Sequence, residues 1–524
     1  MRLDARPVLL AAGFLLGVAA PVLAESRLLE FTQQTRNANN EIVLTKRRID
    51  PATTGVMVID SWNYHWCMTA TERVGAMVPR WNRALECARK LGMTVMWAPS
   101  DVAGSYLGTT QRQRALAVAY QTAPRVRQLD CKFTVVRPPC MCGAGFPCLW
   151  NYGFDGICPD LKIAAQDFIV CGLEEVYGIC QQQGLKHIIF TGLHTNICLF
   201  GKPDALSAMY GAGMDCSVAR DLNDAYSGHD ADHGITPDDG TALTDDDLER
   251  AGVPLINLME EMRKAGVWDD QWVVETVRIA PWGKPGRPYV FSGATRVSLR
   301  APWLENVELR YTLDGSTVTA GATLYHEPIT VDRTTTLRTA AFRNGTPVSL
   351  ETSAYYVVLP PLPPAPDVLL DKVRPLTDLY AAVGPACAAC LWHPVMNQSY
   401  DGRPLRIRAV KYDQGAGIRA PAYLRYTIDP HWDRFVALAG VDDNLLDKEL
   451  GRNLARYPSV VFKVFVDGQC LAQSPVVRIS QEPWRFDVKL PAGARQIVLV
   501  ADDDGTHSPY HLANWVKAGF VLKP

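Results

Sequence analysis

Between about residues 50 and 280, short apolar runs alternate with amphipathic stretches of helical length. The runs at 56–59, 94–97 and 187–190 have no polar alternation, which is typical of strands buried on both faces. A helical stretch over 72–91 stops at Gly92, and another covers 173–183 before Gly184. Repeated strand–helix–strand units predict an α/β three-layer fold, with a parallel sheet between two layers of helices.

Beyond residue 282 the pattern changes to short alternating strands separated by turns. The Asp314-Gly315 and Asn344-Gly345 pairs are strong hairpin signals within 288–358, and they predict a small all-β sandwich. The Pro-rich stretch 359–366 predicts a stiff linker. Strands dominate again from 367 to 524 and predict a second all-β sandwich. The exceptions are short pieces with helical character at 447–455 and 512–517.

The first 24 residues have the organisation of a signal peptide. Arg2 and Arg6 precede an apolar run, and Val22-Leu23-Ala24 places small residues where a signal peptidase would cut. The run is shorter than the roughly 20 residues that a spanning helix needs. We therefore expect an exported protein, periplasmic or extracellular, without a membrane span, and an uncleaved anchor is the alternative. The expected organisation is a signal peptide (1–24), an α/β domain (25–282), a β-sandwich (283–358), a linker (359–366) and a second β-sandwich (367–524).

Composition narrows the classes of partner. Lys and Arg total 53 against 55 Asp and Glu, so no excess of positive charge points to a nucleic acid. Fourteen cysteines are many for a cytosolic protein and ordinary for an exported one. A Pro- and Gly-rich loop holds six of them, which predicts a disulfide-stapled loop, with zinc binding as the alternative. These six are Cys131, Cys140, Cys142, Cys148, Cys158 and Cys171.

Three positions in the α/β domain bear side chains suited to hydrolysis. Asp60 directly follows the first buried strand, at the carboxyl edge where open α/β sheets place their sites. Cys198 lies in the first turn of a helix expected over about 195–210, where free N–H groups favour a thiolate. The ammonium of Lys162 would also favour a thiolate. The structural alternatives are a strand-end carboxylate, a solvated lysine, and a cysteine that is buried or disulfide-bonded.

Together these positions resemble the isochorismatase-like cysteine hydrolases, over roughly residues 50–270. The resemblance rests on Val-Met-Val-Ile-Asp60, on Lys162 six residues before Phe168, and on Gly192-Leu-His-Thr-Asn-Ile-Cys198. It implies that Asp60 is the general base, that Lys162 supports the thiolate and that Cys198 is the nucleophile. It also implies a cis peptide before His194, whose N–H would form an oxyanion hole with that of Cys198.

Two departures from the family pattern narrow the implied chemistry. Members that cleave isochorismate lack the cysteine, so Cys198 favours hydrolysis of an amide-type C–N bond in a small molecule. Nicotinamidase-like members carry an Asp-x-His metal motif where this chain reads Ser100-Asp101-Val102-Ala103. We therefore expect no metal site of that kind and no cofactor, and the segment 229–233 is interpreted as a solvated loop.

The two later units resemble modules found beside glycosidases. Residues 307–317 and 335–342 resemble the chitobiase/hexosaminidase C-terminal β-sandwich, which implies a structural or docking role. Residues 415–417, 440–443 and 464–468 resemble the NPCBM family, which implies binding to a polysaccharide. Aromatic rings stack on sugars, and the four candidate platforms are Tyr412, Trp432, Trp484 and Trp515.

Three functions compete on the sequence alone. The first is an exported cysteine hydrolase tethered to a polysaccharide by its C-terminal module. The second is a carbohydrate-binding or scaffold protein whose hydrolase-like domain is inactive. The third is a thiol redox protein that uses Cys387 and Cys390. Members of the isochorismatase-like family often self-associate, so the resemblance implies a homo-oligomer unless the two appended sandwiches block that surface.

Overall fold

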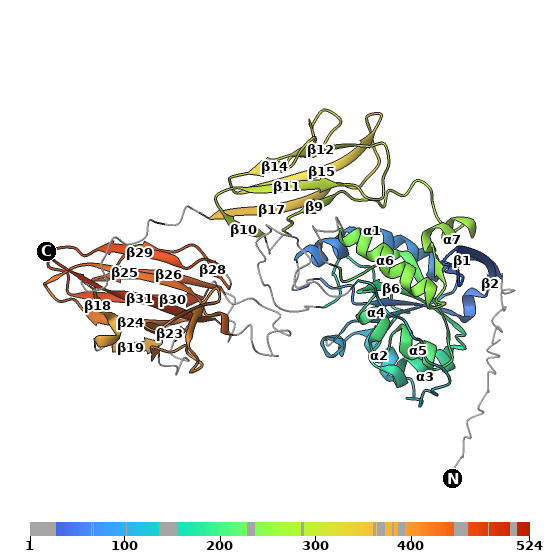
Figure 1. The fold of residues 1–524 in the computed structure, drawn as a ribbon, viewed down its shortest axis with the longest axis horizontal. Helices are drawn as coiled ribbons and strands as arrows, with labels where there is room; N and C mark the ends of the chain where they lie inside the picture. The colour runs from blue at the N-terminus through green and yellow to red at the C-terminus, as the bar shows by residue number, and fades with distance from the viewer. Residues whose placement is uncertain are drawn as a thin grey trace, which may run out of the picture.

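The computed structural model describes residues 28–63, 65, 68–100, 102–135, 156–227, 236–283, 288–359, 363, 373–379, 382–385, 394–444, 459–479, 481–503 and 511–524. The predicted signal peptide, most of the predicted linker, and the pair Cys387 and Cys390 lie outside these residues. An α/β unit and two β-sandwiches follow one another along the chain (Figure 1).

The α/β unit is built on one eight-stranded sheet of order β2-β1-β8-β7-β6-β3-β4-β5. The six strands from β8 to β5 are parallel, as the buried apolar runs predict, and β1 joins β8 antiparallel. The sheet is therefore mixed, and the β1–β2 hairpin at its edge is a feature that the sequence did not indicate. The strands are β1 (Leu29–Arg36), β2 (Ile42–Ile49), β3 (Thr54–Ile59), β4 (Thr94–Ala98), β5 (Phe168–Ile169), β6 (His187–Leu193), β7 (Asp215–Asp224) and β8 (Leu255–Ile256).

Helices cover both faces of this sheet because its central strands are apolar on both sides. Val56 and Val58 of β3 pack in a core with α1, whereas Met57 and Ile59 pack in the opposite core with α3 and α5. The helix expected over 195–210 is two short helices, because Pro203 follows the end of the first. The helices are α1 (Met68–Lys90), α2 (Thr110–Leu116), α3 (Leu173–Gln183), α4 (Cys198–Gly201), α5 (Leu206–Gly211), α6 (Pro237–Arg250) and α7 (Leu258–Lys264).

The middle unit is a β-sandwich, as predicted. One sheet has the order β10-β17-β15-β12-β13 with β16 beside β15, and the other has the order β14-β11-β9. Strand β9 precedes the expected boundary at 282, yet it pairs with β11 of the sandwich. The strands are β9 (Arg278–Ala280), β10 (Tyr289–Ser292), β11 (Thr295–Arg300), β12 (Glu308–Thr312), β13 (Thr323–Leu324), β14 (Ile329–Val331), β15 (Thr335–Arg343), β16 (Thr346–Pro347) and β17 (Thr352–Leu359).

The C-terminal unit is the second β-sandwich, also as predicted. Its two sheets have the orders β20-β23-β31-β25-β29 and β19-β24-β30-β26-β27. The helical piece expected at 512–517 is wrong, since these residues belong to β31, which pairs with both β23 and β25. The strands are β18 (Val373–Pro375), β19 (Ala382–Pro385), β20 (Val395–Met396), β21 (Leu405–Ile407), β22 (Val410–Tyr412), β23 (Gly415–Arg419), β24 (Ala422–Thr427), β25 (Trp432–Val441), β26 (Ser459–Val466), β27 (Gln469–Gln473), β28 (Val477–Arg478), β29 (Trp484–Lys489), β30 (Gln496–Asp503) and β31 (Leu512–Leu522).

Among the helices that the structure describes, none combines the length and the apolar character needed to cross a bilayer.

Candidate active site

Asp60 lies at the carboxyl end of β3, as predicted, and its side chain is almost completely buried. Its backbone has a φ of 49°, a left-handed conformation that Asp adopts more readily than most residues. The carboxylate accepts hydrogen bonds from the N–H and the hydroxyl of Ser100, both at 2.6 Å. Ser100 follows the neighbouring strand β4, so two strand ends together fix this carboxylate.

Cys198 begins α4, shortly after β6, the other neighbour of β3. Gly192 of β6 has a φ of +119°, and a Cβ atom there would lie only 1.9 Å from the carbonyl oxygen of Ile59. A glycine is therefore required where β6 approaches the residue before Asp60. The peptide between Leu193 and His194 is cis, as the resemblance implies.

The amine beside this pair belongs to Lys202 rather than to Lys162. Nζ of Lys202 lies 3.4 Å from Oδ1 of Asp60 and donates to the carbonyl of Ala98 at 2.8 Å. Lys162 is exposed, and its backbone N–H donates to the side chain of Asn82 on α1. The structure thus brings Asp60 and Cys198 together and does not bring Lys162 to them.

A signal for Lys202 was present in the sequence. It follows Cys198 by four residues, a spacing that puts two side chains on one face of a helical turn. The family pattern instead selects Lys162, by its spacing to Phe168.

The thiol of Cys198 is protonated at neutral pH. Burial and the negative charge of Asp60, which also forms a hydrogen bond with the thiol, raise the pKa of Cys198 to about 12. The charge of Lys202 and a hydrogen bond from the His194 main chain act in the opposite direction. Burial alone would lower the pKa of Lys202, but Asp60 and Asp204 outweigh it and raise that pKa. The resting site therefore holds a neutral thiol beside an ammonium–carboxylate pair.

The ring of His194 is anchored behind the site. It is buried, with Nδ1 3.6 Å from Oδ2 of Asp224 at the end of β7. Burial lowers the pKa of His194, so this ring is neutral at physiological pH. Packing and the contact with Asp224 thus hold the side chain of His194, one of the two residues whose N–H groups are predicted to form an oxyanion hole.

The prediction of a disulfide-stapled loop is wrong at two of its six cysteines. Cys131 and Cys171 carry free thiols. Burial, aided by the charge of Asp247, raises the pKa of Cys131 to about 12, and burial also raises the pKa of Cys171. Both are therefore reduced side chains of the α/β unit. The remaining loop cysteines at 140, 142 and 148 lie outside the described residues, and Cys158 is buried close to Asp160.

Three of the four aromatic platforms predicted for sugar stacking are core residues. Trp432 is stacked on Phe520 with ring centroids 4.0 Å apart, and Trp515 is fully buried. Trp484 is also buried in this core. A stacking platform needs an open ring face, so these three assignments are wrong. Tyr412 at the end of β22 is half-buried and is the one candidate of the four with an accessible side chain.

Comparisons with known proteins identify the two C-terminal units. Residues 381–521 match the model of the NPCBM/NEW2 domain, and residues 289–353 match that of the chitobiase/beta-hexosaminidase C-terminal domain. These matches agree with the resemblances drawn for the two sandwiches. The chain therefore carries modules of the carbohydrate-binding kind, which are typical of secreted proteins.

One curated relative is a protein of Renibacterium salmoninarum named as an endo-alpha-N-acetylgalactosaminidase. It is 30% identical over 121 residues, which are 23% of this chain and 7% of that protein. This chain thus spans a small part of the length of the relative that it matches.

Similar solved structures include two from Clostridium perfringens. The M60 catalytic domain with the CBM51-1 and CBM51-2 domains of ZmpB is 21% identical, over 36% of this chain and 18% of that one, with a TM-score of 0.25. The CBM51 of GH95 in complex with methyl-galactose is 20% identical, over 28% of this chain and 99% of that one, with a TM-score of 0.24.

A third similar structure is the YcaC gene product of Escherichia coli, an octameric hydrolase of unknown specificity. It is 14% identical, over 41% of this chain and 80% of that one, with a TM-score of 0.23.

Proposed function

We propose that this protein is an exported cysteine hydrolase of the isochorismatase-like type that cleaves an amide-type C–N bond in a small molecule. Cys198 is the nucleophile and Asp60 is the general base. Lys202 forms an ion pair with Asp60 and stabilises its negative charge. The observation that supports this most is the meeting of a thiol, a carboxylate and an ammonium at the carboxyl edge of a parallel sheet. Open α/β sheets place their sites at this edge.

The first half of the reaction forms a thioester. The sulfur of Cys198 attacks the carbonyl carbon of the amide while Asp60 takes the thiol proton, since a thiol with a pKa of about 12 needs a base at neutral pH. The tetrahedral intermediate then expels the amine, which receives the proton from Asp60. The products of this half are an acylated Cys198 and a free amine.

The second half hydrolyses the thioester. Asp60 removes a proton from a water molecule, and the resulting oxygen nucleophile attacks the thioester carbon. Collapse of this intermediate releases a carboxylic acid and returns the proton to the sulfur of Cys198. One amide bond and one water are consumed, and no redox partner is required.

The negative oxygen of both intermediates needs donors that are already in place. The main chain of His194 supplies a hydrogen bond at Cys198, and Asp224 holds the ring of the same histidine. We assign the N–H groups of His194 and Cys198 to the oxyanion hole, where such donors contribute about 3 kcal/mol each.

The C-terminal unit tethers the hydrolase to a polysaccharide. This part of the proposal is supported by the NPCBM/NEW2 match and by the relative that is named as a glycan-cleaving enzyme. The second candidate function is a carbohydrate-binding scaffold with an inactive α/β unit, and the same matches favour it. The two candidates differ only in whether Cys198 turns over a substrate.

Trapping the acyl-enzyme separates these candidates. Wild type and the Cys198→Ala and Asp60→Asn variants are incubated with a panel of aliphatic, aryl and N-acyl-sugar amides. Amine release is measured together with the intact mass of the protein. Turnover of at least one amide, and an acyl adduct mapped to Cys198, are expected for wild type only. If wild type shows neither turnover nor an adduct, the protein is the scaffold.

A further inference from the structure

The main chain of His194 holds the turn that carries Cys198. Its carbonyl oxygen accepts hydrogen bonds from the N–H groups of Ile197 at 2.9 Å and Leu199 at 3.0 Å, the residues on either side of Cys198. The main chain of His194 also forms a hydrogen bond with the thiol of Cys198. The positions of the sulfur and of the N–H groups assigned to the oxyanion hole therefore depend on where His194 is held.

Asp224, at the end of β7, holds this segment by both its main chain and its side chain. Its carbonyl oxygen accepts the N–H of Thr195 at 2.9 Å, and its Oδ2 lies 3.6 Å from Nδ1 of His194. In the parallel pairing of β6 with β7, Asp224 lies opposite Leu193. The residues that lead from β6 to α4 are thus fixed from the end of the neighbouring strand.

The carboxylate of Asp224 is buried, and it forms an ion pair with Arg73 of α1. The side chains of Asp224 and Arg73 are 7% and 2% exposed, and Nε of Arg73 lies 2.8 Å from Oδ1 of Asp224. Burial alone would raise the pKa of Asp224, but the charge of Arg73 and the interaction with His194 outweigh it and lower that pKa. The carboxylate is therefore ionised at neutral pH, and removal of Arg73 would leave a buried negative charge without its ion pair.

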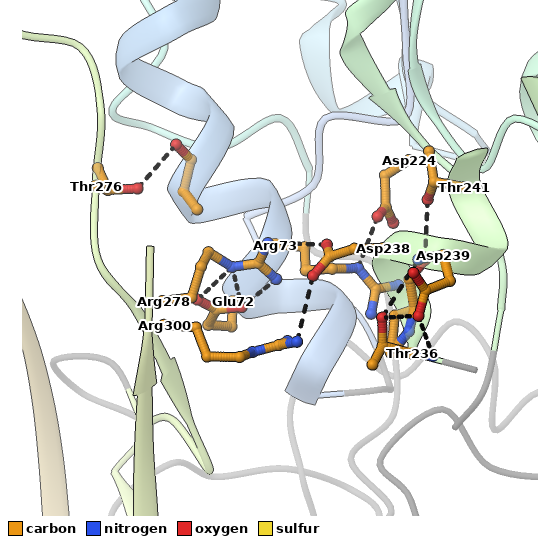
Figure 2. Close-up of polar contacts among 12 residues, drawn as sticks. Glu72, Arg73, Asp224, Thr236, Asp238, Asp239, Thr241, Thr276, Arg278 and Arg300 are labelled. Carbon is orange, nitrogen blue, oxygen red and sulfur yellow. Dashed lines mark hydrogen bonds and ion pairs between the residues drawn. The ribbon is translucent and has the colours of Figure 1, made fainter. Parts of the chain in front are cut away.

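The part of α1 that carries Arg73 also binds the first sandwich. Glu72, the preceding residue, is paired with Arg278 of β9, whose Nη2 lies 2.7 Å from Oε2 of Glu72. Figure 2 shows this pair next to the pair formed by Arg73 and Asp224. Two consecutive residues of α1 thus make one buried ion pair with the sandwich and one with the strand end that holds His194.

We propose that Arg73 is a positioning residue of the thiol site. It neutralises the carboxylate of Asp224, and Asp224 in turn fixes the His194–Thr195 segment. This segment sets the positions of the Cys198 thiol and of the N–H groups of the oxyanion hole. The inference rests on the proposed function, because the site that Arg73 serves is the hydrolase site.

Exchange of backbone amides with deuterium tests the positioning role without a substrate. In full-length Arg73→Met, the amides of residues 195–199 are expected to exchange at least tenfold faster than in wild type. The amides of β4, which is separated from β6 by β3, should change less than twofold. Arg73→Lys keeps a positive charge beside Asp224, so its exchange at 195–199 should stay within threefold of wild type.

Kinetics on any amide that wild type hydrolyses give a second readout. A displaced oxyanion hole weakens binding of the transition state more than binding of the substrate. Arg73→Met should therefore lower kcat at least tenfold while KM stays within threefold of wild type. Arg73→Lys should recover kcat to within threefold of wild type. The rates are measured below the temperature at which each variant begins to unfold, so loss of folded protein does not contribute to them.

Two further variants complete the test. Arg73→Met combined with Asp224→Leu removes both charges, so it leaves no isolated buried charge and serves if Arg73→Met does not fold. It also lacks the carboxylate that holds the segment, and it should show faster exchange at residues 195–199. The matched control is Arg83→Met, which changes an arginine of the same helix whose partner Glu86 is partly exposed, and it should behave as wild type does.

Several outcomes overturn the proposal. These are unchanged exchange at residues 195–199 in a folded Arg73→Met or in the double variant, equal acceleration of the β4 amides, and no recovery by Arg73→Lys. A rise of KM at unchanged kcat would also overturn it. If wild type hydrolyses no amide, the proposed function fails while the exchange experiment still decides the role of Arg73, so the two failures are distinguishable.

Discussion

Lys202 and Ser100 share the carboxylate of Asp60. Oδ1 receives the N–H of Ser100 at 2.6 Å and lies 3.4 Å from the ammonium of Lys202, while Oδ2 receives the hydroxyl of Ser100. The carboxylate is thus fixed from two sides and still interacts with the thiol of Cys198. Because Asp60 interacts with the thiol, replacing Lys202 or Ser100 should change the reactivity of Cys198.

Replacing Asp60 by Asn should increase the rate of Cys198 alkylation and decrease the rate of amide hydrolysis. The negative charge of Asp60 helps to raise the pKa of Cys198, so its removal lowers that pKa while Lys202 and the His194 hydrogen bond remain. Each unit by which the pKa falls gives about tenfold more thiolate. Alkylation of Cys198 by iodoacetamide at pH 8 should therefore accelerate, while amide hydrolysis should fall about 10²- to 10⁴-fold because the general base is lost. Slower alkylation would contradict the assigned geometry.

The two lysines give a matched comparison. Lys202→Met removes the charge that lowers the pKa of Cys198, so alkylation should slow by several-fold and hydrolysis should decrease. Lys162→Met should leave both rates within twofold of wild type, since this side chain is exposed and its backbone contacts are on α1. Rates of modification at residue 198, read by peptide mass spectrometry, decide between them. The opposite ranking would restore the role predicted for Lys162.

Asp245 should make the α/β unit less stable at alkaline pH. Burial raises the pKa of Asp245 to about 7 in the folded protein, against about 3.9 in the unfolded chain. The folded state therefore binds the extra proton, and this contribution is fully present below about pH 3.9 and is lost as the pH rises through 7. Asp245→Asn should be more stable than wild type at pH 9 by about 2 kcal/mol, with a smaller gain at pH 5.

Hydrogen exchange of the β7 amides at the two pH values measures this difference within the α/β unit. The control is Asp270→Asn, which changes a carboxylate that is 81% exposed and should shift stability by less than about 0.5 kcal/mol at either pH. Equal stability of wild type and Asp245→Asn at pH 9 would argue against a protonated Asp245.

The pair formed by Glu72 and Arg278 should be important for docking of the first sandwich. Arg278 is buried and bonds to both carboxylate oxygens of Glu72, at 2.8 Å each from Nε. Glu72→Gln leaves a buried guanidinium without its counter-charge and should cost about 3 kcal/mol. Glu86→Gln on the same helix is the control, since its partly exposed pairs with Arg83 and Lys90 contribute about 0.5 kcal/mol. Thermal unfolding of the full chain compares the two variants.

Trp515 and Tyr412 should behave oppositely in the C-terminal unit. Trp515 is fully buried among Phe435, Phe462 and Phe486, so Trp515→Ala should destabilise this sandwich by about 3–5 kcal/mol. Tyr412→Ala should leave the melting temperature unchanged within about 2 °C. If Tyr412→Ala also lowers retention on an insoluble polysaccharide, its ring is a contact for sugar. Unchanged melting of Trp515→Ala would contradict the buried position.

The positions of Asp60 and Cys198 at the candidate site were predictable from the sequence, whereas the prediction chose the wrong lysine to accompany them. Apolar runs mark the parallel strands, and the carboxyl ends of such strands gather at one edge, so Asp60 and Cys198 were expected to meet. The position of the amine depends on where α4 ends and on how a long side chain reaches back to the strand ends. The four-residue spacing from Cys198 to Lys202 is a local signal for that lysine but does not fix the path of its side chain, and Lys162, which fitted the family motif, is exposed.

The tryptophans and β31 show a second limit of sequence reasoning. Whether a Trp faces the core or the solvent depends on the register between strands far apart in the chain, as for Trp515 and its partner Ala416 on β23. Strand β31 is buried on both faces along most of its length, so it has little alternation from which to recognise a strand. A short apolar run of this kind is ambiguous until its neighbours are known.

Strand β9 has a consequence for how this protein can be divided or recombined. Its backbone completes a sheet of the sandwich through β11, while its Arg278 side chain is inserted against α1 of the preceding unit. If the chain were cut at residue 282, β9 would lose β11, its pairing partner in the sandwich. If it were cut before residue 278, the buried Glu72 would lose its ion pair with Arg278. We therefore expect the first two units to fold and unfold together, whereas the NPCBM/NEW2 unit shares none of its described strands with them.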